Sequence, residues 1–226
     1  MAHNWQDQAF AEAWDSRHLT GNPARAEHLS LLLAMLDQVA DGWILDLGCG
    51  SGLVARMVLD QKPAARIFGL DSSTAMLELA KERLALYGER VTLAEADLTA
   101  LDHLEAPATC SGAIAVQSLH HLEEAQYRAA VRWTFDHLAP GGSFFVIDRL
   151  AIPSERLYSA FHDLRERQGQ SPNPSDWSGY VEWLEVNGDR PLPVQSILRV
   201  LEEAGFQSAA LDVRGDRGML IGRRGA

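Results

Sequence analysis

The sequence predicts an α/β fold in which a doubly wound, mostly parallel sheet ends in an antiparallel hairpin. Apolar segments of strand length alternate with segments of helical periodicity over most of the 226 residues. This order is typical of a parallel sheet with helices on both faces. An apolar run at residues 44–47 leads into residues 48–52 (Gly-Cys-Gly-Ser-Gly), as expected of a strand-to-helix turn. Two short strand patterns joined by residues 214–217 (Arg-Gly-Asp-Arg) predict the closing hairpin.

Two helices are expected before the sheet begins. Residues 4–19 have an amphipathic pattern with aromatic weight, which includes Trp14. Residues 20–23 (Thr-Gly-Asn-Pro) break this pattern. Residues 24–39 place leucines on one face, which predicts a second helix.

The central part of the chain is expected to supply five strands and the helices between them. The strands are short apolar runs bounded by turn residues, at residues 43–47, 66–70, 91–94, 112–116 and 143–147. The helices follow the helical period, at residues 53–60, 75–87 and 123–138. Ser72 or Ser73 can cap the second of these helices, and Gly88 can end it. Residues 140–142 (Pro-Gly-Gly) predict a turn before the fifth strand.

The remainder of the chain departs from strict alternation. Residues 151–193 form an insert with aromatic residues around a proline-containing breaker. Because this insert follows the fifth strand, on the ligand side of such a sheet, we expect it to act as a lid. A helix at residues 194–204 and strands at residues 207–213 and 218–222 close the fold.

The glycine-rich turn predicts a ligand site. Glycine allows positive φ and a close approach of the backbone to a ligand, and a loop that feeds a helix at the end of a strand is a nucleotide-site geometry. The spacing Gly-x-Gly-x-Gly differs from the Gly-x-Gly-x-x-Gly of dinucleotide binders, which disfavours a nicotinamide-dependent oxidoreductase. Asp46, two residues before the first glycine, suits an ammonium-bearing ligand better than a phosphate.

Acidic residues also stand at the next two strand ends, where ligands of open α/β sheets bind. Asp71 can accept hydrogen bonds from ribose hydroxyls, and it lies 23 residues after Gly48, close to the expected offset of about 20. Asp97 can accept from the amine of an adenine, with Leu98 against the ring. Either acid could instead cap a helix or close a turn. Because suitable residues stand at three successive strand ends, we favour ligand binding over a role in caps or turns.

These motifs together resemble the class I S-adenosylmethionine-dependent methyltransferases. The resemblance covers residues of about 40–150 and 194–223, and its motifs are residues 45–52, 69–71, 96–98, 119–122 and 138–142. It implies a Rossmann-like, seven-stranded sheet with the last strand antiparallel, and S-adenosyl-L-methionine as the cofactor. It further implies that the cofactor-binding residues are Asp46, Gly48, Cys49, Gly50, Gly52, Asp71, Ser72, Met76, Asp97, Leu98 and Gln117.

Methyl transfer from a sulfonium is an in-line displacement that a dry pocket favours, and it needs a base only if the acceptor must lose a proton. His120 is the candidate base, because its place faces the pocket in some relatives, whereas the place of His121 is normally structural. Residues that could contact the acceptor are Trp14, His121, Arg149, Tyr158, His162 and Tyr180. His120, His162 and Asp148 could in principle hold a metal ion, but their spacing does not require one, and we expect none.

Composition limits the partners. The net charge of −11 disfavours a broad nucleic-acid surface. The arginines near the C-terminus form either a local basic patch or a solvated hairpin, and they are Arg214, Arg217, Arg223 and Arg224. The two cysteines, Cys49 and Cys110, make no disulfide framework. With neither a secretory signal nor a membrane span in the sequence, we expect a cytoplasmic protein.

The expected function is S-adenosylmethionine-dependent methyl transfer to an O, N or C atom of a small-molecule acceptor. Two alternatives stay open: methylation of RNA or protein, and a protein of the same fold that binds S-adenosylmethionine with different chemistry or none. A homodimer is also left open. We expect one domain, divided into an N-terminal helical cap, a cofactor-binding core, a lid insert and a closing helix with hairpin, at residues 1–40, 41–150, 151–193 and 194–226.

Overall fold

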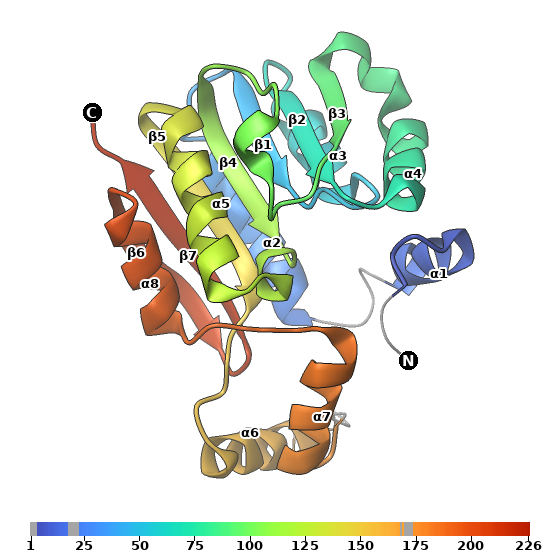
Figure 1. Ribbon diagram of the computed structural model, residues 1–226, viewed down its shortest axis with the longest axis vertical. Coiled ribbons are helices and arrows are strands. Elements are labelled where there is room, and N and C mark those ends of the chain that lie inside the picture. The colour runs from blue at the N-terminus through green and yellow to red at the C-terminus, as the bar shows by residue number, and fades with distance from the viewer. Residues whose placement is uncertain (1–3, 18–22, 168, 170–173) are drawn as a thin grey trace.

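The computed structural model describes residues 4–17, 23–167, 169 and 174–226. A seven-stranded sheet in the order β3-β2-β1-β4-β5-β7-β6 runs through the molecule (Figure 1). Its strands are β1 (Trp43–Leu47), β2 (Arg66–Asp71), β3 (Val91–Glu95), β4 (Cys110–Val116), β5 (Leu138–Arg149), β6 (Phe206–Arg214) and β7 (Arg217–Arg224). Strand β7 is antiparallel to both of its neighbours, and the other pairs are parallel, so the predicted fold is confirmed.

Helices cover both faces of this sheet. They are α1 (Gln8–Arg17), α2 (Pro23–Leu36), α3 (Leu53–Gln61), α4 (Thr74–Leu84), α5 (Glu124–His137), α6 (Glu155–Arg167), α7 (Trp177–Asn187) and α8 (Val194–Glu203). Alternate residues of the strands enter two separate cores. In β5, Phe144 packs on the side of α5 and α8, whereas Phe145 packs on the side of α2, α3 and α4. This alternation is the pattern of a doubly wound sheet.

Most predicted elements are found within a few residues of their expected positions. Strand β1 has the predicted bounds, and Ser73 caps α4 by accepting a hydrogen bond from the backbone N–H of Met76 at 3.1 Å. Helix α4 ends at Leu84, earlier than expected, and a 3₁₀ segment continues to Arg90. The expected breaker at residues 20–23 lies, except for its last residue, outside the described residues, as do residues 18 and 19 of the first predicted helix.

Strand β5 begins earlier than the sequence predicts. Leu138 pairs with Cys110, and the register then shifts so that Gly112 pairs with Ser143. The predicted turn at residues 140–142 is therefore an irregularity inside the strand, and Gly141 has a φ of +77° there. Four residues of β5 (139–142) stand opposite one residue of β4 (111), and the ladder is paired on either side of them.

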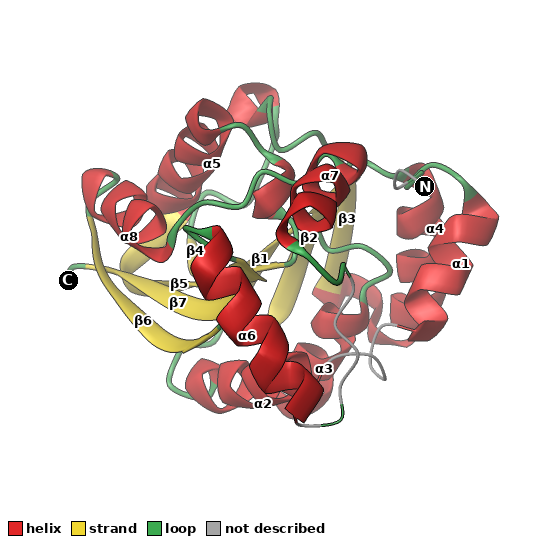
Figure 2. Cartoon of the chain, turned by 90° about the horizontal axis from the view of Figure 1, so that it is seen from below, coloured by secondary structure: helices red, strands yellow, loops and turns green. Residues whose placement is uncertain are grey.

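Two helical elements stand at the end of the sheet where the parallel strands finish. Helix α1 packs beside α4, and the insert forms the pair α6 and α7 (Figures 1 and 2). The role of this insert as a lid stays a prediction. Among the described helices, none has the length and apolar character that crossing a membrane requires.

Candidate functional site

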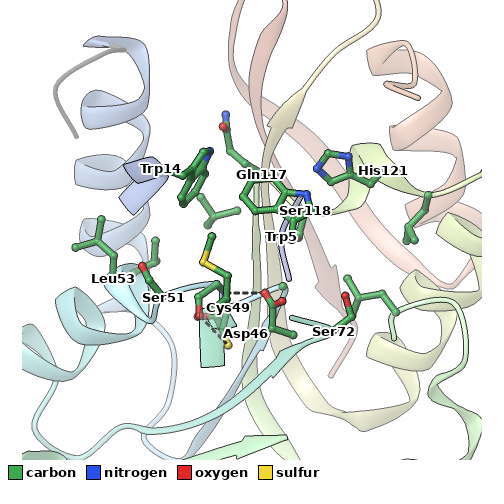
Figure 3. A pocket seen from close by; sticks show the side chains of 18 of the residues that line it. Trp5, Trp14, Asp46, Cys49, Ser51, Leu53, Ser72, Gln117, Ser118 and His121 are labelled. Carbon is green, nitrogen blue, oxygen red and sulfur yellow. Dashed lines mark hydrogen bonds between the residues drawn. The ribbon is translucent and has the colours of Figure 1, made fainter. Parts of the chain in front are cut away.

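A cavity of about 290 Å³ lies at the carboxyl ends of the parallel strands, between them and α1 (Figure 3). Ten of the predicted cofactor residues line it, and they are Asp46, Gly48, Cys49, Gly50, Asp71, Ser72, Met76, Asp97, Leu98 and Gln117. Trp14 and His121, predicted to contact the acceptor, also line it. The fold brings these residues together because parallel strands end at one edge of a sheet.

The three glycines of the turn have different structural roles. A Cβ on Gly48, which has a φ of +72°, would lie 2.3 Å from the Cβ of Ser118, so only glycine allows the two loops to approach. Gly50, with a φ of +53°, faces open space. Gly52 is not among the residues that line the cavity, and its contact with the cofactor stays a prediction. It starts α3 with a φ of +73°, and a Cβ there would meet Leu84 at 2.9 Å.

Asp71 connects the turn to the end of β2. Its carboxylate accepts hydrogen bonds from the backbone N–H groups of Gly50 at 2.8 Å and Ser73 at 2.9 Å. Burial raises the pKa of Asp71, and the hydrogen bonds from these two N–H groups partly oppose that rise. Asp97 likewise closes a turn, since it accepts from the N–H of Thr99 at 2.8 Å. Both acids thus have a structural role and also face the cavity.

Asp46 is a buried carboxylate with an unused oxygen. Its side chain lines the cavity, the residue is 1% exposed, and its Oδ2 has no hydrogen-bond partner. Burial, and then the charge of Asp71, raises the pKa of Asp46 to about 7. A buried acceptor without a partner is costly. An ammonium group in the cavity would satisfy it.

Arg25 of α2 is a cavity residue that the sequence analysis missed. It is 6% exposed, its Nη1 donates to the Oε1 of Gln117 at 3.3 Å, and its Nε has no partner. Burial, followed by repulsion from Arg217, lowers the pKa of Arg25 to about 9, against attraction by Asp148. Gln117 has a φ of +59°, a strained conformation that is typical of functional sites. The guanidinium can meet a carboxylate in the cavity.

The two adjacent histidines are oriented opposite to expectation. His120 is buried away from the cavity wall: its Nδ1 contacts a carboxylate oxygen of Asp148, and its backbone N–H donates to the other at 3.0 Å. His121 lines the cavity, and its Nδ1 lies 3.1 Å from Asp189 (Figure 3). Both histidines belong to the 3₁₀ turn Leu119–His121 and their ring centroids lie 4.1 Å apart, but only His121 lines the cavity. His121 is thus the histidine placed to act on a molecule in the cavity.

Helix α1 covers the cavity and is attached to the glycine turn. Trp5 and Trp14 line the cavity from this side. Arg83 of α4 pairs with Asp15 at 2.6 Å and donates to the backbone carbonyl of Ser51 in the turn. The ion pair therefore joins α1, α4 and the turn, so that opening the cavity on this side requires breaking it.

The other predicted acceptor residues line a second cavity of about 150 Å³. These are Arg149, Tyr158, His162 and Tyr180. Asp189 lies between the two cavities, with Oδ1 3.1 Å from His121 and Oδ2 3.2 Å from the Nε of Arg149. Asp189 therefore connects a residue of the first cavity, His121, to a residue of the second, Arg149.

The metal ligands weighed from the sequence do not converge, because His162 lies in the second cavity while His120 pairs with Asp148. Within the described chain, the groups close enough to share an ion are His120 with His121 and Asp189, and His162 with Asp163 and Glu166. Arg149 already contacts the carboxylate of Asp189, which makes that cluster less suited to a cation.

Comparison with known proteins places these features in a family. The family described as "Methyltransferase domain" matches residues 44–142. Trans-aconitate 2-methyltransferase of Methylobacterium nodulans is 33% identical over 191 residues, which cover 77% of this chain and 68% of that protein. Carboxy-S-adenosyl-L-methionine synthase of Campylobacter jejuni is 25% identical over 207 residues, which cover 89% of this chain and 85% of the relative.

Solved structures share the fold at low identity. A putative O-methyltransferase from Nostoc punctiforme has a TM-score of 0.69 and 19% identity, with 97% of this chain and 60% of that one covered. Human N-acetylserotonin methyltransferase, solved in complex with S-adenosylmethionine, has a TM-score of 0.61 and 17% identity, with coverages of 97% and 55%. The chain thus spans little more than half the length of these two proteins.

Proposed function

We propose that this chain transfers a methyl group to a small-molecule acceptor. The chain belongs to the class I S-adenosylmethionine-dependent methyltransferases, and its cofactor is S-adenosyl-L-methionine. The cofactor would occupy the cavity of about 290 Å³, and the second cavity, lined by most of the predicted acceptor residues, measures about 150 Å³, which suits a small molecule. The net charge of −11 also disfavours RNA as the acceptor. Relatives named for trans-aconitate act on a small molecule, which supports the same class here.

The cavity fits the two charged groups at the amino-acid end of the cofactor. Asp46 offers an unpartnered carboxylate oxygen for the ammonium, and Arg25 offers an unpartnered N–H for the carboxylate. These two orphaned atoms carry the proposal, because buried polar groups without partners are rare and indicate a ligand. Asp71 would hold the ribose, and Asp97 with Leu98 would hold the adenine.

The cofactor supplies a methyl group on a positively charged sulfur. The residues of the chain contribute position and a dry environment, since α1 closes the cavity with Trp5 and Trp14. For an acceptor that must lose a proton, His121 would take it, and Asp189 would orient the imidazole and stabilise its charge. The role predicted for His120 as the base is untested, and its pairing with Asp148 favours a structural role.

A second candidate function is the synthesis of carboxy-S-adenosyl-L-methionine, named for the Campylobacter relatives. The alignment with them spans 89% of this chain and 85% of the relative. The two functions leave different nucleosides: methyl transfer leaves S-adenosylhomocysteine, whereas the second yields a product heavier than the cofactor. Mass spectrometry of the nucleosides after turnover distinguishes them.

Calorimetry with S-adenosylhomocysteine tests the proposed cofactor site. Asp71→Ala removes hydrogen bonds to the ribose and is expected to weaken binding by about 1–3 kcal/mol. Asp136→Ala, which removes an exposed carboxylate on α5, is the matched control and should bind as the wild type does. Equal affinity of Asp71→Ala and the control would remove Asp71 from the site. NAD serves as the comparison ligand, and we expect it not to bind.

A further inference from the structure

The second cavity has the features of an anion site. We propose that it binds a carboxylate or phosphate group carried by the acceptor, as an anchor separate from the atom that is methylated. This proposal rests on the proposed function, because it assigns a chemical class to the acceptor of the same site. The cavity lies under α6 and α7 and against the ends of β5 and β7.

Buried polar atoms of residues that line this cavity lack a hydrogen-bond partner within the described chain. The donors among them are the Nη1 of Arg217 and the hydroxyl proton of Tyr180, since the backbone N–H of Ile152 beside that hydroxyl can only donate to it. The Nε2 of His162 is a third donor in one of its two tautomers, and the Oδ1 of Asp216 is an acceptor without a partner. Tyr180 is 3% exposed, so water does not readily satisfy its hydroxyl. Buried donors normally find partners, and the unpaired protons of Arg217 and Tyr180 around one cavity indicate a missing acceptor. An oxyanion offers several acceptor positions at once.

The arginine side chains that line the cavity also favour the binding of an anion. Arg149 of β5 and Arg217 of β7 are directly opposite each other in the antiparallel ladder. Like charges in such positions repel and destabilise the pair of strands. Arg165 adds a third guanidinium to the lining, against the single carboxylate of Asp216. This excess of positive charge stands in a chain with a net charge of −11.

Neighbouring side chains contact the guanidinium of Arg149 closely, whereas the guanidinium of Arg217 has fewer contacts and could bind an anion. Arg149 lies 3.1 Å from Asp216, 3.2 Å from Asp189 and 4.3 Å from the ring of Trp183. The Nε of Arg217 is 3.9 Å from Asp216. Burial lowers the pKa of Arg149, and repulsion from Arg217 lowers it further, against attraction by Asp216 and Asp189. A bound anion would relieve this repulsion. The interpretation of the hairpin as solvated holds for Arg214, whose side chain is 47% exposed, but not for Arg217, whose side chain is 14% exposed.

The size and position of the cavity define what it can hold. A volume of about 150 Å³ accommodates one oxyanion and a few carbon atoms, with Tyr158 and Tyr180 as apolar walls. Asp189 contacts both Arg149 of this cavity and His121 of the cofactor cavity, so the anion and the cofactor would lie on either side of that carboxylate. An acceptor could thus be anchored by one anionic end while another atom reaches the methyl group.

The test measures binding of citrate and of inorganic phosphate to the full chain saturated with S-adenosylhomocysteine. Calorimetry and thermal melting are run against sodium chloride at equal ionic strength. We expect one or both anions to bind and to raise the melting temperature. The stronger of the two identifies the group as a carboxylate or a phosphate. If neither anion binds more strongly than chloride, the proposal is wrong.

Variants locate the site. Arg217→Gln should weaken anion binding about tenfold or more, and Tyr180→Phe should weaken it by a smaller factor. Tyr180→Phe removes the hydroxyl and keeps the ring, so it remains informative if Arg217→Gln does not fold. Arg56→Gln, at an exposed arginine of α3, is the control for loss of charge. Anion binding that is unchanged in Tyr180→Phe, and in Arg217→Gln where that variant folds, would overturn the assignment.

The same titrations separate this proposal from the proposed function. Binding of S-adenosylhomocysteine is measured first, in the absence of added anion. Its failure would contradict the cofactor site while the anion measurements still report on the second cavity. Intact cofactor binding with no anion binding would contradict only the anion site.

Discussion

The Nδ1 of His121 lies 3.1 Å from the buried carboxylate of Asp189. Burial opposes the charge on Asp189, but the adjacent imidazoles of His121 and His120 hold the pKa of Asp189 below its ordinary value. The carboxylate is therefore ionised and can orient and stabilise an imidazolium. Because His121 lines the cofactor cavity, this pair has the arrangement of a general base and its orienting group.

His121→Ala is expected to lower turnover by about 10²- to 10⁴-fold for an acceptor that loses a proton, the usual contribution of a positioned base. Formation of S-adenosylhomocysteine measures the rate. The affinity for S-adenosylhomocysteine should stay close to that of the wild type, which separates loss of the base from loss of the site. Full activity of His121→Ala on a hydroxyl acceptor would exclude it as the base.

His120→Ala should instead unfold more easily. Burial alone would raise the pKa of Asp148, but the imidazole of His120 holds it below its ordinary value. Removing that partner leaves a buried charge, at an expected cost of about 3 kcal/mol or more near neutral pH. Stability that a lowered acid pKa provides is lost as the pH falls through that pKa, so the difference from the wild type should shrink in acid. Urea titrations of both proteins at neutral and acidic pH measure this, and equal stability at neutral pH would contradict it.

Asp46→Asn should stabilise the protein that has no ligand while it weakens cofactor binding. The pKa of Asp46 is about 7 in the folded protein and 3.8 for an ordinary aspartate, so folding takes up a proton between these values. The stability of the wild type therefore falls as the pH rises through this window. At about pH 8 the substitution should add up to about 4 kcal/mol, and near pH 4 it should add little. Denaturant titrations across pH measure the difference, and a gain that does not depend on pH would contradict the assigned pKa.

Arg83→Gln should release the cofactor faster. The variant breaks the 2.6 Å ion pair with Asp15 that attaches α1 over the cavity. We expect dissociation of S-adenosylhomocysteine to accelerate about tenfold, since a partly buried charged hydrogen bond is lost. The fluorescence of Trp5 and Trp14 reports dissociation in stopped flow. Lys81→Gln removes an exposed pair on the same helix and is the control. Equal dissociation rates of the two variants would show that α1 does not retain the ligand.

Local signals in the sequence are sufficient to predict the sheet and most of the cavity. The apolar run of β1 ends at a glycine turn, and both its bounds agree with the structure. Asp46, Asp71 and Asp97 were predicted to lie near one another because parallel strands end at a common edge, and all three line the cavity. Their contacts with the cofactor are still predictions.

Features that depend on distant contacts could not be predicted from the sequence. Arg25 stands at the start of a helix whose pattern shows only its leucines, and its burial comes from packing against the end of β4. The orientation of His120 and His121 depends on Asp148 and Asp189, which follow much later in the chain. Gly52 has the same spacing as the other glycines, yet its place is set by contact with Leu84.

A crystal structure of the full chain grown with S-adenosylhomocysteine would decide whether this cavity is the cofactor site. We expect the ligand to fill the cavity beside Gly50, with its ammonium against Asp46, its carboxylate against Arg25 and its ribose against Asp71. An empty cavity, or a ligand whose amino-acid end lies away from both Asp46 and Arg25, would contradict this expectation.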